Sequence, residues 1–169
     1  MILALALFAC TPDDVTDEPK DTAGDTADTD TDPSTGPGDI HDAWVSEGDD
    51  ISVLFSAPPF AYVRIEATFN ADASYVVTTT DGEGATADLT GTFVTDDSTN
   101  PGTITLTQAT PYDATAVGIW QVERDTLSYE VVQTLPDYGF VPPTPDTGFG
   151  STSGPGVAAD SNVQIYQRM

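Results

Sequence analysis

The chain has 169 residues, and its 28 acidic and four basic side chains give a formal net charge of −24 at pH 7. This charge excludes nucleic acid as a partner, because phosphate binding needs Lys and Arg, and it opposes binding to anionic membrane surfaces. The length allows one domain and a tail. A single cysteine excludes an intramolecular disulfide, so packing must stabilise the domain.

The first ten residues are apolar and end at Cys10. This run is too short for a membrane span, which takes about 20 residues, and is typical of the apolar part of a secretory signal. Leu7-Phe8-Ala9-Cys10 resembles a bacterial lipobox, although no Lys or Arg precedes it. The resemblance implies a signal over residues 1–9, Cys10 as lipid anchor, and a bacterial cell envelope location, with the outer membrane expected. The alternative is an incidental cysteine in a short apolar N-terminus.

Residues 10–39 predict an acidic, disordered tether. Ten acidic residues and Lys20 give this segment a net charge of −9, and it has almost no large apolar side chains. Such a chain cannot bury enough apolar surface to offset the entropy that it would lose on folding. As a flexible chain, its ends would lie roughly 30 Å apart. Asp28, Asp30 and Asp32 alternate as in a calcium loop, but Pro33 stands where the sharp turn needs Gly. We therefore expect no metal site here.

The most regular pattern lies between residues 62 and 95, which predict three consecutive strands. Residues 62–69 alternate with the period of two of a half-buried strand, and residues 74–80 are rich in β-branched and aromatic side chains. The expected inward residues are Val63, Ile65, Ala67 and Phe69 in the first strand, and Ala87, Leu89, Gly91 and Phe93 in the third. Tyr62 is expected to face outward.

Further short strands are predicted on both sides of this stretch. They cover residues 51–55, 103–107, 116–122, 127–131 and 163–167. Their expected inward residues are Ile104, Leu106, Leu127, Tyr129, Val131, Val163 and Ile165. Residues 135–160 are rich in Pro and Gly and predict a long loop, which is either a lid or binding loop or a surface excursion.

The elements together predict an all-β domain over residues 40–169. About eight or nine short strands joined by tight turns, without a convincing helix, favour an antiparallel up-and-down barrel of about eight strands. A closed barrel also removes exposed strand edges. A β-sandwich is the alternative.

The order of these signals resembles a small bacterial lipocalin-like domain, a family often found in lipoproteins. The resembling residues are Trp44, Phe69-Asn70-Ala71-Asp72-Ala73-Ser74-Tyr75, Gly91-Thr92-Phe93, Gly118-Ile119-Trp120 and Asp125-Thr126-Leu127. The sequence departs from the family at Asp42, where a Gly is expected, and in the long loop. The resemblance implies a meandering barrel that often binds a small apolar ligand in its mouth. The candidate lining residues are Trp44, Phe69, Tyr75, Phe93, Trp120 and Tyr129. For Trp44 and Trp120 a place in the core or as a plug at a barrel end is favoured, and pocket lining is the alternative.

No residue set forms a catalytic signature. His41 is the only histidine and has neither a partner His nor a free Cys nearby in sequence, so a metal site or general base is not expected. Gly91 and Gly118 lie within strands and indicate tight bending or close packing. A hydrolase with paired carboxylates would need two facing acids in a cleft.

The sequence thus favours a non-enzymatic, lipid-anchored envelope lipoprotein, without cofactor or metal, whose barrel binds a small apolar ligand. Small barrels either fill their interior with side chains or enclose one ligand, and Ala67, Ala87 and Gly91 leave room for a ligand. The alternative is a structural or adhesive envelope protein with a packed barrel and a macromolecular partner.

Overall fold

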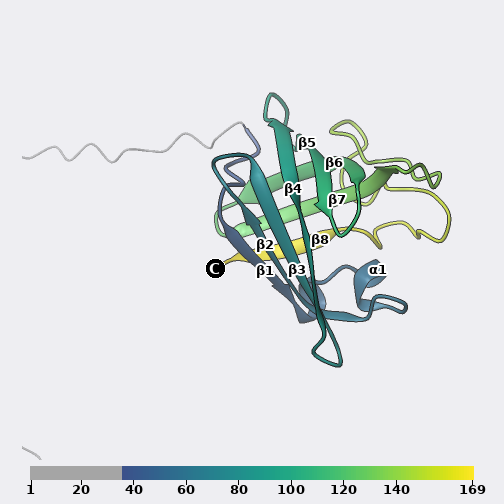
Figure 1. Ribbon diagram of the computed structural model, residues 1–169. Helices are drawn as coiled ribbons and strands as arrows, with labels where there is room; N and C mark the ends of the chain where they lie inside the picture. The colour runs from purple at the N-terminus through teal and green to yellow at the C-terminus, as the bar shows by residue number, and fades with distance from the viewer. Residues whose placement is uncertain (1–35) are drawn as a thin grey trace, which may run out of the picture. The chain divides into compact units, whose positions relative to one another are not determined.

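Residues 36–169 form a closed antiparallel barrel of eight strands in this computed structural model, which describes those residues (Figure 1). Neighbours in sequence pair around the barrel, and the last strand pairs with the first. The predicted up-and-down barrel is confirmed, and the β-sandwich alternative is wrong. The strands are β1 Ala43–Glu47, β2 Tyr62–Phe69, β3 Ser74–Asp81, β4 Thr86–Asp96, β5 Gly102–Thr110, β6 Ala114–Glu123, β7 Thr126–Leu135 and β8 Gln164–Arg168.

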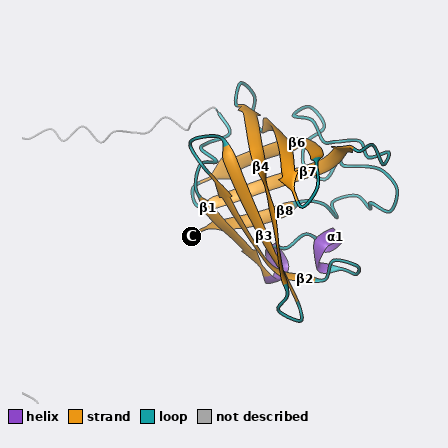
Figure 2. Cartoon of the chain, viewed as in Figure 1, coloured by secondary structure: helices purple, strands orange, loops and turns teal. Residues whose placement is uncertain are grey.

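The strand predicted over residues 51–55 is wrong, because this segment turns into a short helix (Figure 2). A 3-10 turn, η1 Gly48–Asp50, precedes the single-turn helix α1 Val53–Ser56. The Ser52 side chain accepts a hydrogen bond from the backbone N–H of Phe55, at 3.4 Å, and so caps the helix. The first strand of the barrel is instead β1, which carries Trp44.

A register shift in β2 reverses the expected faces of its first two residues. The pairing with β3 is irregular between Tyr62 and Arg64, and such a bulge turns side chains to the other face. Val63 is therefore 52 % exposed, whereas Tyr62 packs against the core. From Ile65 onward the expected inward residues of this strand are buried.

The inward face of β8 also differs from the prediction. Gln164 and Tyr166 are buried, while Val163 and Ile165 are only partly buried. Gln164 donates a hydrogen bond to the Ser46 hydroxyl and accepts one from the Ser52 backbone N–H at 3.0 Å. These partners come from β1 and the start of α1, so the polar side chain of Gln164 makes its hydrogen bonds inside the barrel. The face of β8 that carries Gln164 is therefore the inward one, and not the face of Val163 and Ile165 that the sequence predicted.

One end of the barrel is filled by aromatic side chains, which we call the plug: Trp44, Phe69, Phe93 and Trp120, each at most 3 % exposed. The Phe69 and Phe93 rings meet edge to face at 5.2 Å between centroids. The indole N–H of Trp44 donates to the Ile40 carbonyl at 2.9 Å, and that of Trp120 to the Thr103 carbonyl at 3.1 Å. The interpretation of the two tryptophans as core residues that plug a barrel end is therefore confirmed.

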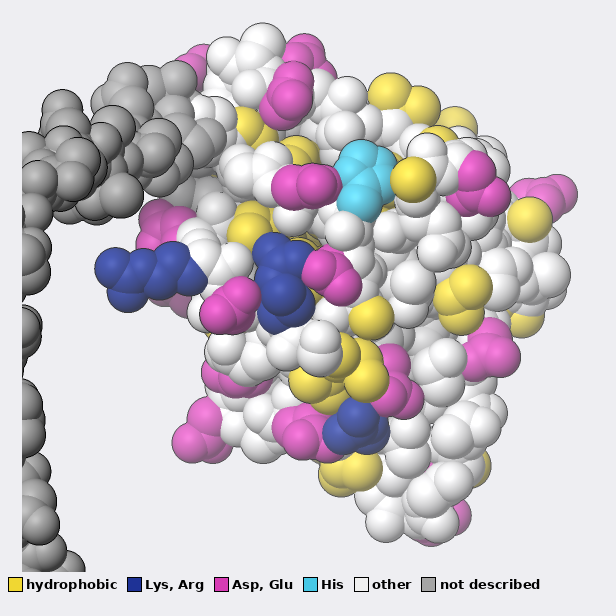
Figure 3. Space-filling view, turned by 90° about the vertical axis from the view of Figure 1, so that its left-hand side faces the viewer, with side chains coloured by type: hydrophobic (Ala, Val, Ile, Leu, Met, Phe, Trp, Pro, Cys, Tyr) yellow, Lys and Arg dark blue, Asp and Glu magenta, His cyan; other side chains and the backbone are white. Residues whose placement is uncertain are grey.

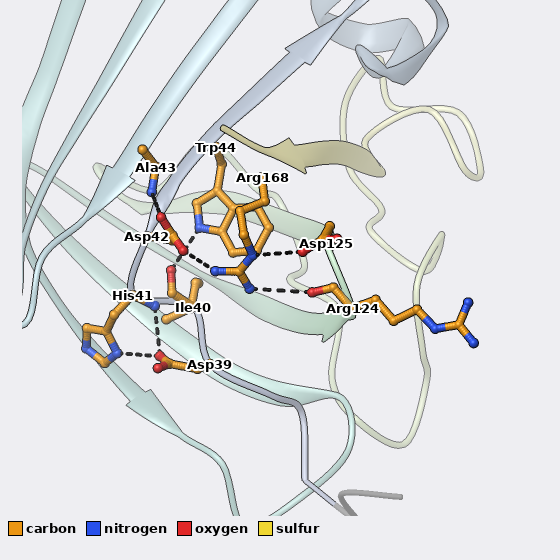
Figure 4. A network of polar contacts seen from close by, with 9 residues as sticks. All are labelled: Asp39, Ile40, His41, Asp42, Ala43, Trp44, Arg124, Asp125 and Arg168. Carbon is orange, nitrogen blue, oxygen red and sulfur yellow. Dashed lines mark hydrogen bonds and ion pairs between the residues drawn. The ribbon is translucent and has the colours of Figure 1, made fainter. Parts of the chain in front are cut away.

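Arg168 closes the plug from outside (Figure 4). Its guanidinium carbon lies 4.5 Å from the Trp44 ring centroid, within the range of a cation–π contact. It also donates to the carboxylate of Asp42, pairs with Asp125 at 3.3 Å, and donates to the Arg124 carbonyl at 3.4 Å. Strands β1 and β8 and the β6–β7 turn thus meet at this one side chain.

Gly118 permits a close approach of β6 and β7. A Cβ at this position would lie 1.9 Å from the carbonyl oxygen of Glu130, and one at Gly91 would lie 2.0 Å from that of Thr107. Both distances are far below a van der Waals contact, so no other residue fits without movement. The prediction that these two glycines mark close packing is confirmed.

The long connection between β7 and β8 is held against the barrel. The backbone N–H groups of Gly150 and Thr152 donate to the Glu130 carboxylate at 2.6 and 3.0 Å, and Glu130 is 1 % exposed. The Asn162 side chain donates to the Val131 carbonyl at 2.9 Å. Residues 150, 152 and 162 therefore anchor the connection, residues 136–163, on β7.

The structured chain also begins before residue 40. Pro37, which the sequence placed in the tether, is buried, and its carbonyl accepts a hydrogen bond from the Val122 backbone N–H at 2.6 Å. The lipobox, Cys10, the calcium-loop pattern and the rest of the proposed tether up to residue 35 lie outside the described residues. Within residues 36–169, no helix is long and apolar enough to span a membrane.

Candidate functional site

The barrel end opposite the plug holds a cavity of about 520 Å³. Its walls come from the ends of β2 to β7, with Val77, Leu89, Leu106 and Val131 among the apolar side chains that line it. A volume in this range is typical of small-molecule sites, which are concave and mostly apolar. The barrel interior is thus filled at one end and hollow at the other.

The rim of the cavity is built by α1 and by the β5–β6 and β7–β8 connections. Phe60, Tyr112 and Tyr138 line it and are 40 %, 57 % and 60 % exposed. Phe55, on α1, stacks edge to face on Phe60 at 5.5 Å. The backbone N–H of Leu54 donates to the Ser161 carbonyl at 2.8 Å, which joins α1 to the β7–β8 connection. The two lie at the same end of the barrel in Figure 1.

Three tyrosines of β3, β7 and β8 form the floor of the cavity. Tyr75, Tyr129 and Tyr166 line it and are 3 %, 7 % and 4 % exposed. The ring of Tyr129 meets that of Tyr166 edge to face at 6.1 Å. On its other side Tyr129 lies 6.0 Å from Phe69, so the floor rests on the plug.

The six residues that the sequence offered as pocket lining are therefore split between two places. Tyr75 and Tyr129 lie on the cavity floor, whereas the other four form the plug beneath it. Sequence reasoning missed Phe55, Tyr62 and Tyr166 as lining residues. Phe55 was assigned to a strand that is a helix in the structure, and Tyr62 was assigned to the outer face because the bulge in β2 has no signal in the sequence.

The cavity contains few polar side chains, and most of their donors are engaged. Gln108 donates to the Tyr112 carbonyl at 2.9 Å, Gln133 to that of Pro136 at 3.2 Å, and Thr79 to that of Ala87 at 3.3 Å. Asn162 donates to the Val131 carbonyl, as described above. These hydrogen bonds hold the side chains against the walls, although the amide groups of Gln108 and Gln133 each keep a second N–H that these bonds do not use.

Burial changes the acidity of the floor tyrosines. It raises the pKa of the Tyr75 hydroxyl to about 12 and also raises the pKa of Tyr166. The pKa of Tyr129 is raised well above its ordinary value by burial and by the neighbouring Tyr166 and Tyr75 hydroxyls. All three hydroxyls therefore remain protonated, and able to donate, at neutral pH.

No charged side chain lines the cavity. Arg64 pairs with Glu47 and Glu66 on the outside of the barrel, and Arg168 lies over the plug. Figure 3 shows one face on which the few dark blue cations stand among magenta acids. The cavity thus has neither a cation for a carboxylate ligand nor the two facing acids of a glycosidase.

His41 lies at the surface beside the plug. It is exposed, and its Nδ1 lies 2.7 Å from Asp39 Oδ1 (Figure 4). Among residues 36–169, no three His, Cys, Asp or Glu side chains gather into a group that could hold a metal ion. The cavity lining itself offers apolar surface together with a few hydroxyl and amide groups.

Comparisons with known proteins do not identify the chain. No protein-family model, curated protein or solved structure matches it. The eight-stranded barrel is consistent with a lipocalin-like fold, and membership of that family stays a prediction from the sequence.

Proposed function

We propose that this protein is a non-enzymatic binding protein that carries a small, mainly apolar molecule in its barrel. The observation that supports this is the cavity of about 520 Å³, whose lining is apolar apart from a few hydroxyl and amide groups. Burying apolar ligand surface there contributes roughly 25 cal/mol per Å². The hollow end of the barrel also argues against the alternative of a fully packed structural barrel.

The proposal includes attachment to a bacterial envelope through Cys10. It is supported by the sequence Leu7-Phe8-Ala9-Cys10 and by the acidic segment that follows. Lipid attachment would hold the barrel near a membrane, while the net charge of −24 would oppose close contact of its surface with anionic lipids. Radiolabelled palmitate should enter the wild-type chain expressed in bacteria but not the Cys10→Ser variant. Equal labelling of both would contradict the anchor.

Ligand binding is tested by filling the cavity. Val77 lines it, whereas the adjacent Val76 is 37 % exposed and is not among the lining residues. Val77→Trp should abolish binding of the neutral apolar dye N-phenyl-1-naphthylamine, measured by its fluorescence with the full chain carrying Cys10→Ser. Val76→Trp places the same side chain outside the cavity and should bind like the parent.

Native mass spectrometry of the same chain, purified without detergent, gives an independent result. A carrier that retains its cargo should show extra mass that leaves on denaturation, and Val77→Trp should lack it. If Val77→Trp and Val76→Trp bind the dye equally well, the cavity is not the binding site and the proposal is wrong.

A further inference from the structure

The floor of the cavity presents three hydrogen-bonding groups without a protein partner. No hydrogen bond joins the hydroxyls of Tyr75, Tyr129 and Tyr166 to any other group of residues 36–169, yet each residue is at least nine-tenths buried. No fully enclosed side-chain polar atom in this part of the chain lacks a partner. The three hydroxyls must therefore reach the open space of the cavity.

These hydroxyls differ from the amide and threonine side chains of the cavity. Thr79, Gln108, Gln133 and Asn162 each donate at least one hydrogen bond to a backbone carbonyl. A tyrosine hydroxyl offers one donor and also accepts, and leaving it unpaired in an apolar site is unfavourable. A ligand that brings a polar group to the floor recovers these hydrogen bonds.

The charge of that polar group is limited by the surroundings. With no Lys, Arg or His in the lining, a carboxylate would lose its hydration without gaining a counter-charge, which is strongly unfavourable. The net charge of −24 adds long-range repulsion of anions. An ammonium group meets no carboxylate in the lining either, so hydroxyls and carbonyls fit the floor best.

We infer that the ligand is an uncharged amphiphile, a mainly apolar molecule with a hydroxyl or carbonyl oxygen that the hydroxyls of Tyr75, Tyr129 and Tyr166 bind at the cavity floor. This inference rests on the proposed carrier function and adds the chemical class and orientation of the ligand. The oxygen lies deep, on the tyrosines, and the apolar part extends past Val77 and Leu89 toward Phe55 and Phe60.

Three probes of equal chain length test the charge of the ligand. Dodecanol, dodecanoate and dodecylamine compete with N-phenyl-1-naphthylamine for the full chain carrying Cys10→Ser, at pH 8. Dodecanol should displace the dye at a concentration at least about tenfold lower than either charged analogue. Equal or tighter binding of dodecanoate or dodecylamine would overturn the inference while leaving the carrier function intact.

Tyrosine-to-phenylalanine variants test the hydrogen bonds. Tyr129→Phe and Tyr166→Phe should each weaken dodecanol about fivefold, the loss expected for one hydrogen bond, and leave dye binding unchanged. Thr105→Val removes a hydroxyl from the exposed outer face of β5, outside the cavity lining, and should change neither value. If no floor variant affects dodecanol, the tyrosines do not bind its oxygen. A chain that binds neither dye nor dodecanol would instead contradict the carrier function itself.

Discussion

Single residues with unusual surroundings determine how the barrel closes. Gly118 allows β6 and β7 to approach where any side chain would meet the Glu130 carbonyl, and Arg168 joins Trp44, Asp42 and Asp125. The backbone N–H of Ala43, and then the Arg168 guanidinium, lower the pKa of Asp42. The ion pairs at Arg168 are partly exposed, so we assign the stability of this end mainly to packed Trp44.

Gly118→Ala should destabilise the barrel by about 2 kcal/mol or more, the cost of forcing an extra group into a packed region. The added Cβ would lie 1.9 Å from a backbone oxygen that belongs to the β6–β7 pairing. Denaturant unfolding measures the change. Gly82→Ala is the control, because the nearest atom to its Cβ is 3.9 Å away. Equal stability of both variants would mean that β6 and β7 are not this close.

Among the elements, the β7–β8 connection is anchored on β7 by a buried carboxylate. Two backbone N–H groups of the connection donate to this carboxylate, that of Glu130. Hydrogen bonds to a carboxylate are stronger than those between neutral groups. Phe140, Pro155 and Val157 of the same connection line the cavity, so the anchor at Glu130 also shapes the binding site.

Glu130→Ala should release this connection without unfolding the barrel. Removing the carboxylate leaves the N–H groups of Gly150 and Thr152 unpaired, so their amide hydrogen exchange should accelerate at least about tenfold. The amides of β2 to β5 should keep their protection. Glu83→Ala, in the exposed β3–β4 turn, should leave all of these rates unchanged. Unaltered exchange at residue 150 in Glu130→Ala would show that other contacts hold the connection.

At the scale of the whole molecule, three buried tyrosines make the free energy of unfolding depend on pH in the alkaline range. Their pKa values are raised in the folded state, that of Tyr75 to about 12, while an unfolded chain titrates near 10. Above pH 10 the unfolded chain therefore loses protons that the folded chain keeps. Linkage requires the free energy of unfolding to be unaffected by these groups below pH 10 and to fall as the pH rises toward 12.

Denaturant titrations at pH 8, 10, 11 and 12 should show this loss, and tyrosinate absorbance should rise together with unfolding. Tyr129→Phe removes one of the three linked groups and should flatten the decline. Thr105→Val removes an exposed hydroxyl that does not titrate in this pH range, so this variant should show the same decline as the parent. Stability that stays constant from pH 10 to 12 would contradict the burial of the floor tyrosines.

Much of the fold could be predicted from the sequence because its signals are local. Alternation in residues 65–69 and 103–107 and the turns at residues 70–73 and 81–84 concern neighbours in the chain, and they determine strands and their up-and-down order. Strong acidity likewise follows from composition alone. The lipobox pattern at Cys10 is also a local signal, and it stays a prediction.

The tertiary structure decided where the barrel is filled and where it is hollow. Trp44 and Trp120 lie at one end because β1 begins and β6 ends there. Four of the six aromatic residues listed as candidate pocket lining therefore form the plug instead. Gln164 turns inward because Ser46 and Ser52, more than a hundred residues away, satisfy it, and a bulge opposite β3 brings Tyr62 inward. These outcomes depend on partners distant in sequence, which alternation within one segment does not contain.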